Sequence, residues 1–171
     1  MKISKELKIE LEEIYQTFLN DEKIKRMKDI NMHRGSNCFE HSFKVAKKAI
    51  RWANRSRRKI NFQTLLIGAI LHDYYLYDWR KDRSKKKRHG RNHPSIAAEN
   101  ASRDFAISKD IKYIIKTHMW PINSHSFPKT IEAKIVSMCD KAVTVGESLT
   151  SIKFKEKRRA KYQKYLSLLF A

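Results

Sequence analysis

The sequence predicts an all-α protein, and three observations support this fold class. Glycine and proline are scarce, with 4 and 3 residues in a chain of 171, which argues against a loop-rich or all-β fold. Apolar residues recur at helical spacing in most segments, and hydrophobic residues make up 41% of the chain. A chain of this length can bury enough apolar surface to fold without disulfides. We therefore expect one compact helical domain over residues 1–171.

Composition also limits the compartment and the partners. No apolar run reaches the roughly 18 residues of a membrane span, and the charged N-terminus lacks the core of a signal peptide, so we expect a cytoplasmic protein with no membrane partner. Cys38 and Cys139 lie far apart and outside any C-x-x-C pattern, which is typical of a reducing compartment. The formal net charge of +20 favours an anionic partner, although lysines also simply fill solvated helix faces.

Helical periodicity predicts the elements of the first third of the chain. Residues 3–20 carry apolar side chains at helical spacing, which predicts an amphipathic helix. After a polar stretch, a second helix is expected from about Cys38 to Asn54, and Ser36 or Asn37 is expected to cap it.

The central and C-terminal elements follow from the same patterns. Residues 62–71 are apolar nearly all round, so they predict a central buried helix, with Asn61 as its cap. The aromatic and then basic stretch 74–92 predicts a long loop of the kind that carries function. Further helices are expected from Pro94 to about Phe105, from Thr130 to about Leu149, and from Ile152 to Phe170. Another is expected to run to His118, with Ser108 as its cap.

Histidine and aspartate residues stand in register with the apolar faces of these helices. His41 shares a helical face with Val45 and Trp52, and Asp140 lies about one turn after Val136. A histidine alone on such a face is more often a hydrogen-bonded core residue, but a buried carboxylate is costly unless it is paired or binds a metal. The ordered set at helix ends and inward faces therefore predicts a metal site built from His41, His72, Asp73, His93, His118 and Asp140.

The donor types and the order of the sequence blocks narrow this prediction. Imidazole and carboxylate together suit Zn, Fe, Ni or Mn, and the absence of cysteine from the set disfavours a structural zinc site. The stretches CFEHSFKVAKKA, LLIGAILHDYYLYDW, HGRNHPSIAAENA, KTHMWP and SMCDKAVT occur in this order over about residues 33–145. In these blocks the sequence resembles the HD superfamily of metal-dependent phosphohydrolases.

The resemblance implies a bundle of the HD-domain type and a division of the ligands. One metal would be held by His41, together with the His72-Asp73 pair and Asp140. Two further histidines match the branch that binds a second metal, and these are His93 and His118. The additional histidine of relatives that cleave cyclic dinucleotides has no counterpart beside His118, which favours the pattern of dinucleoside polyphosphate hydrolases.

The expected activity is hydrolysis of a phosphomonoester, phosphodiester or phosphoanhydride bond in a small nucleotide-like substrate. Two divalent transition-metal ions would generate a bridging hydroxide as the nucleophile, with Asp73 as the bridging carboxylate. Lys141 is expected to act in catalysis as a cationic donor to the transferring phosphoryl group. The expected substrate-binding residues are His33, Arg34, Arg80, His89 and Arg91.

Two other hypotheses stay open at this point. The basic tracts RWANRSRRK, RKDRSKKKRHGR and KFKEKRRAKYQK, with interleaved aromatics, are typical of a nucleic-acid-binding protein. That hypothesis explains the charge but not the inward-facing histidines and aspartates. The other hypothesis is a catalytically degenerate HD-fold sensor or scaffold, and the occupation of all six ligand positions argues against it.

Overall fold

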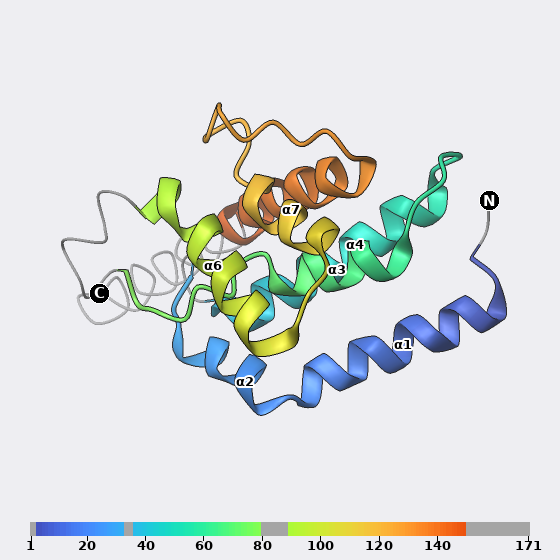
Figure 1. Ribbon diagram of the computed structural model, residues 1–171, viewed down its shortest axis with the longest axis horizontal. Coiled ribbons are helices and arrows are strands. Elements are labelled where there is room, and N and C mark those ends of the chain that lie inside the picture. The colour runs from blue at the N-terminus through green and yellow to red at the C-terminus, as the bar shows by residue number, and fades with distance from the viewer. Residues whose placement is uncertain (1–2, 33–35, 80–88, 150–171) are drawn as a thin grey trace, which may run out of the picture.

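The structure is a computed structural model that describes residues 3–32, 36–79 and 89–149 (Figure 1). These residues form helices and no strand, which confirms the predicted all-α class. None of the described helices is long and apolar enough to cross a membrane. The elements are α1 (Lys5–Asn20), α2 (Glu22–Lys25), the 3-10 helix η1 (Arg26–Asp29), α3 (Cys38–Arg55), α4 (Phe62–Leu71), α6 (His89–Phe105) and α7 (Lys109–Thr117), and residues 131–149 are also helical.

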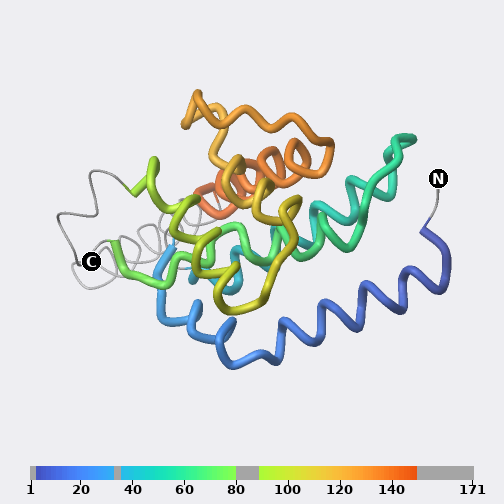
Figure 2. Tube along the Cα trace, viewed as in Figure 1, coloured from blue at the N-terminus to red at the C-terminus, as the bar shows by residue number. Residues whose placement is uncertain are grey.

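Helix α4 forms the centre of the bundle. It packs against α3 on one side and against α7 on another, and α7 also packs on α6 (Figure 2). The side chains of α4 are apolar on nearly every face, so Leu65, Leu66, Ala69, Ile70 and Leu71 are all at most 2% exposed. The central buried helix predicted over residues 62–71 is confirmed with its boundaries.

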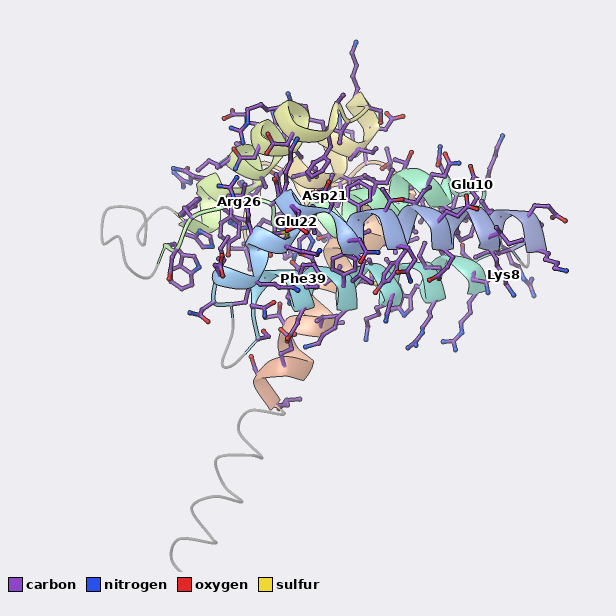
Figure 3. The ribbon with its side chains drawn as sticks, turned by 90° about the horizontal axis from the view of Figure 1, so that it is seen from below. Lys8, Glu10, Asp21, Glu22, Arg26 and Phe39 are labelled. Carbon is purple, nitrogen blue, oxygen red and sulfur yellow. The ribbon has the colours of Figure 1, made fainter. Side chains whose placement is uncertain are left out.

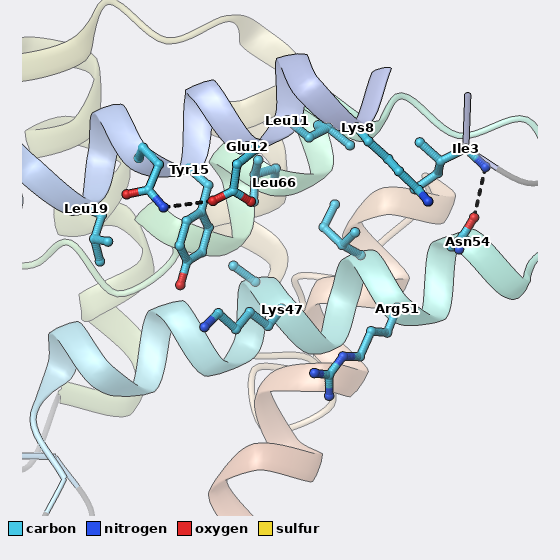
Figure 4. Close-up of a pocket in the computed structure, with 13 residues that line it drawn as sticks. Ile3, Lys8, Leu11, Glu12, Tyr15, Leu19, Lys47, Arg51, Asn54 and Leu66 are labelled. Atoms are coloured by element: carbon cyan, nitrogen blue, oxygen red, sulfur yellow. Dashed lines mark hydrogen bonds between the residues drawn. The ribbon is translucent and has the colours of Figure 1, made fainter. Parts of the chain in front are cut away.

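Helix α1 lies on the outside of this core and is separated from α3 by a groove (Figure 4). The groove has a volume of about 750 Å³, and the buried side chain of Leu11 lines it. Lys8, Lys47 and Arg51 line its edges, and at one end the Ile3 N–H donates to Asn54 Oδ1 at 3.0 Å. Leu11 is the one buried residue of α1, and the half-buried Leu7, Ile14, Phe18 and Leu19 also pack against the core.

The short elements α2 and η1 lie in a stretch for which the sequence predicted no helix. Asp21 follows α1 and caps α2, because its Oδ1 accepts the backbone N–H groups of Lys23 at 2.8 Å and Ile24 at 3.0 Å. Figure 3 shows this junction beneath the bundle, with α2 continuing from the end of α1. The segment is ordered by tertiary packing, since Ile24 and Met27 are both 0% exposed.

Three predicted N-caps are confirmed. The side chains of Asn37, Asn61 and Ser108 each accept the backbone N–H three residues further on, at 2.8, 3.0 and 3.3 Å. Each of these bonds satisfies one of the helix N–H groups that has no partner within the helix. The sequence therefore located the start of α3, α4 and α7 correctly.

Two details of the helix predictions are wrong. Helix α6 begins at His89 and not at Pro94, so Pro94 lies inside the helix. The extra turn is held by contacts that a sequence does not show, because the Tyr77 hydroxyl lies 2.9 Å from His89 Nδ1 and the Trp79 ring stacks on His89. Trp52 is 40% exposed and does not share the inward face of His41. The helix expected over residues 152–170 lies outside the described residues.

Asn61→Ala is expected to lower the free energy of unfolding by about 1 kcal/mol, because the Thr64 N–H at the start of α4 loses its acceptor. Chemical denaturation of the two proteins measures this difference. Asn61→Asp keeps an acceptor oxygen and serves as the control, which should retain most of the stability. An unchanged unfolding free energy in Asn61→Ala would show that water replaces the cap without loss.

Candidate metal centre

Six buried polar side chains from five helical segments converge at one place. They lie in the first turn of α3, at and just after the end of α4, in α6, at the end of α7 and in the helical segment 131–149. None is more than 8% exposed. The structure thus brings together the whole set predicted from the sequence, which is His41, His72, Asp73, His93, His118 and Asp140.

Asp73 lies between the histidines of two neighbouring clusters. Its Oδ2 is 3.3 Å from His72 Nε2, and its Oδ1 is 3.2 Å from His93 Nε2 and 3.5 Å from His118 Nε2. Asp73 shares one group of close ligand atoms with His41 and His72, and another with His93 and His118. Within each group these atoms all lie within 4.8 Å of one another.

Asp140 stands on the His41 side of the centre. Its Oδ1 lies 3.1 Å from His41 Nε2 and 3.8 Å from His72 Nε2. Asp140 also forms a close group with His72 and His118. Two carboxylates and four imidazoles therefore share one small buried volume.

Three of the histidines have their ring orientation fixed by the backbone. Nδ1 of His72, His93 and His118 lies 2.8, 2.8 and 2.7 Å from the carbonyl oxygens of Ala69, His89 and Ile115. A carbonyl oxygen only accepts hydrogen bonds, so Nδ1 carries the hydrogen in each ring. When these rings are neutral, each Nε2 is left with a lone pair that points into the centre.

The inward-pointing atoms fit a divalent cation. Nε2 of His93 and Nε2 of His118 face each other at 3.0 Å, and two lone pairs at this distance repel unless a cation or a proton is shared between them. His72 Nε2 and Asp73 Oδ1 are buried and form no hydrogen bond of good geometry, although each lies within 3.3 Å of another group of the centre. Buried polar atoms rarely remain unsatisfied, and imidazole nitrogens with carboxylate oxygens form the donor set of Zn, Fe, Mn and Ni. The residues present therefore suit a metal.

The electrostatics of the centre keep both carboxylates charged. Burial opposes the charge on Asp73, but His72 and His93 outweigh it and hold the pKa of Asp73 well below its usual range. Burial opposes the charge on Asp140 as well, and His41 and His72 keep its pKa low in the same way. Burial lowers the pKa of His118 to about 3, so this ring is neutral at pH 7.

The two carboxylates favour the charged form of His72. Burial disfavours its charged form, but Asp73 and Asp140 outweigh burial and raise the pKa of His72 to about 10. A metal ligand must be deprotonated, so a metal that binds here displaces the proton of the charged form. The carboxylates thus attract a cation whether it is a proton or a metal.

The turn that follows α4 is held in place from outside the cluster. Asn100 on α6 donates its side-chain N–H groups to the carbonyls of Tyr74 at 3.2 Å and Tyr75 at 3.1 Å. The Cys38 thiol at the start of α3 donates to the Asp73 carbonyl at 3.1 Å. These bonds satisfy the irregular backbone after the helix and fix the direction of the Asp73 side chain.

Glu147 is a residue of the centre that the sequence analysis missed. Its Oε2 accepts from His41 Nδ1 at 3.0 Å and from the Ser36 hydroxyl at 3.1 Å, and its Oε1 accepts from Lys44 Nζ at 2.9 Å. Burial opposes its charge, but His41 and Lys44 lower the pKa of Glu147 to about 2. Glu147 lies seven residues after Asp140 on the same helix, and this spacing was the signal that could have found it.

A cavity of about 330 Å³ opens onto the centre. Asp73, His93, His118 and Asp140 line it, together with apolar side chains such as Met32 and Ile122. Its size is that of a site for a small molecule.

The other predicted site residues lie in different surroundings. Lys141 lines the cavity, donates to the His118 carbonyl at 2.6 Å and lies 3.4 Å from Asp140 Oδ2. His89 lines it as well, stacked on Trp79 with ring centroids 4.8 Å apart. Arg91 is exposed on α6 and is not among the residues that line the cavity. The remaining predicted residues lie outside the described part of the chain, and these are His33, Arg34 and Arg80.

Comparison with known families gives a match over residues 38–144 to the model described as HD domain, and this span holds all six clustered residues. Comparison with the curated proteins and comparison with the solved structures gave no match.

Proposed function

The chain belongs to the HD domain family, and from this premise we propose that it is a phosphohydrolase that uses two divalent metal ions bound at the cluster. One observation carries the proposal. The Nε2 atoms of His93 and His118 face each other at 3.0 Å while both Nδ1 atoms are bonded to backbone carbonyls. This arrangement is unfavourable in a packed core, and a cation makes it favourable.

The cluster divides into two metal positions that share one carboxylate. His41, His72 and Asp140 would serve the first position, and His93 with His118 would serve the second, with Asp73 between the two. When bound, the metal ions supply a water of lowered pKa and polarise the phosphoryl oxygens. The protein's part is to fix these donors through the hydrogen bonds of their Nδ1 atoms.

The cavity residues complete the site for a phosphorylated substrate. Among the described residues that line the cavity, Lys141 is the one lysine or arginine. Its Nζ lies beside Asp140. Its positive charge would stabilise the charge that develops on the transferring phosphoryl group. Trp79, Met119, Ile122 and Val145 supply apolar walls that suit the non-phosphate part of a nucleotide-like molecule.

Hydrolysis of phosphorylated compounds by the metal-loaded protein is the direct test. Protein reconstituted with Mn²⁺, Fe²⁺, Zn²⁺ or Ni²⁺ should cleave at least one member of a panel of nucleoside monophosphates, dinucleoside polyphosphates and phosphodiesters, measured by chromatography of the products. The same protein stripped with a chelator is the control and should be inactive until metal is restored, because the cluster offers no catalysis without a cation. If elemental analysis shows no metal after reconstitution, the proposal is wrong.

The nucleic-acid hypothesis remains as a second candidate on one observation. Trp52 is 40% exposed on α3 between the exposed Arg51 and Arg55, which places an aromatic ring among cations. Oligonucleotides belong in the same panel for this reason. Binding that weakens with salt and needs no metal would support this candidate over hydrolysis.

A further inference from the structure

We propose that the two metal positions are unequal, and that Glu147 makes the position at His41 the tighter one. The inference rests on the proposed function, because it requires two metals at the cluster. It assigns to Glu147 the role of a positioning residue, which acts on the metal through His41.

The first observation is that the groups accepting the Nδ1 hydrogen of the histidines differ. His41 donates its Nδ1 hydrogen to the charged carboxylate of Glu147 at 3.0 Å, whereas His72, His93 and His118 donate theirs to neutral backbone carbonyls. Hydrogen bonds to a charged acceptor are roughly twice as strong as those between neutral groups. A carboxylate behind an imidazole also makes the opposite ring nitrogen a stronger donor to a metal.

Glu147 is itself held firmly. Lys44 donates to one of its oxygens at 2.9 Å, and Ser36 donates to the other at 3.1 Å. The side chain of Glu147 is 11% exposed, so water competes little for these bonds. Because Glu147 bonds across from the helix of Asp140 to α3, it also fixes the distance between His41 and Asp140, whose facing atoms lie 3.1 Å apart.

The second observation is the difference in access. His93 and His118 line the 330 Å³ cavity, whereas His41 and His72 do not, and both are 0% exposed. Both histidines of the second position therefore reach the cavity, whereas the first position would reach it only through Asp140 and the shared Asp73. Exchange with a chelator must begin at the position that faces the cavity.

The third observation is the distribution of charge. Asp140 lies within 3.8 Å of both His41 and His72, and Glu147 adds a further negative charge next to His41. Asp73 is the carboxylate within 3.5 Å of both His93 and His118, and the first position shares it, whereas Asp140 approaches His118 only within 4.8 Å. A divalent cation is held more strongly where more negative charge surrounds it. The first and third observations favour tighter binding at the His41 position, and the second makes exchange at that position slower.

Graded removal of metal from the full-length protein tests the inference. Protein loaded with Zn²⁺ is equilibrated with increasing concentrations of a chelator, and the zinc that remains per chain is measured by elemental analysis. We expect two separate steps, with one equivalent lost at a concentration at least about tenfold lower than the other. His93→Ala should abolish the weak step and leave the tight one.

Glu147→Gln tests the assigned cause. The glutamine keeps the shape and can still accept the His41 N–H, but the negative charge is gone. We expect the tight step to weaken by about 10- to 100-fold while the weak step stays in place. Glu99→Gln makes the same chemical change at an exposed site on α6 and should alter neither step. Thermal unfolding of each variant checks that the fold is retained.

The outcomes separate the inference from the function on which it rests. Loss of both equivalents in one step, or two unchanged steps in a folded Glu147→Gln variant, would overturn the inference and leave the two-metal site standing. Binding of no zinc at all would overturn the two-metal site itself. If Glu147→Gln does not fold, the wild-type and His93→Ala titrations still decide whether the positions are unequal.

Discussion

Asp73→Asn is expected to lower kcat by about 100-fold or more, because one carboxylate serves both halves of the centre. Its two oxygens lie 3.2 to 3.5 Å from the Nε2 atoms of His72, His93 and His118. An asparagine offers one oxygen instead of two and carries no charge, so it cannot connect two cations. The variant should also lose some stability, because His72 and His93 outweigh burial in favouring the charged form of Asp73, so thermal unfolding of the variant accompanies the kinetics.

Steady-state kinetics on a substrate found in the panel, with elemental analysis of the same preparation, measure this effect. Asp110→Asn at the exposed start of α7 is the matched control and should retain wild-type activity. A fully active Asp73→Asn protein would show that the centre has been assigned the wrong chemistry. A fall in kcat with unchanged metal content would place the role of Asp73 in the reaction and not in metal binding.

Gly68→Val is expected to lower the free energy of unfolding by about 3 kcal/mol, because α4 and α7 cross in contact at this residue. A Cβ at Gly68 would lie 2.9 Å from Ile114 Cγ2 and 3.0 Å from Ile114 Cδ1. Ile114 is 1% exposed, so its side chain has no free space to move into. Gly68→Ala should cost less, since it adds the Cβ without the two further methyl groups of valine and gains about 1 kcal/mol of helix propensity.

Gly68→Val should also disturb the metal centre. His72 follows Gly68 by four residues on α4, and His118 follows Ile114 by four residues on α7. A change in the separation of the two helices is therefore passed to the two rings, whose centroids are 4.9 Å apart. Denaturation and metal analysis measure the two effects. Gly146→Ala is the control, because a Cβ there meets nothing within 4 Å, and a Gly68→Val protein as stable as wild type would contradict the packing argument.

The helices and the cluster could be predicted because local patterns determine them. The apolar run before His72 leaves α4 no exposed face, and Asn61 marks its start, so neither depends on distant contacts. His41 and Asp140 were found because a polar residue on an apolar face is unfavourable unless it has a partner. The residues of a site whose burial is energetically most unfavourable are thus the easiest to detect in a sequence.

The features that the sequence did not predict depend on tertiary contacts, which a linear pattern does not contain. Glu147 resembles any glutamate on a helix, and what distinguishes it is its approach to His41 and Lys44 on α3. Helix α6 starts early because Tyr77 and Trp79 hold His89 from the preceding segment. For Glu147 the sequence carries only a weak sign, its spacing of seven residues from Asp140, and for the early start of α6 it carries none.

Helices α4 and α7 both end at the centre, with His72 and His118 as their C-caps. The C-terminal end of a helix carries about half of a negative elementary charge, so two helix dipoles add to the field of Asp73 and Asp140. Without a bound cation, this negative charge disfavours a phosphate group. Under the proposed function we therefore expect metal to bind first and substrate second, because the bound cations reverse the sign of the field that the substrate meets.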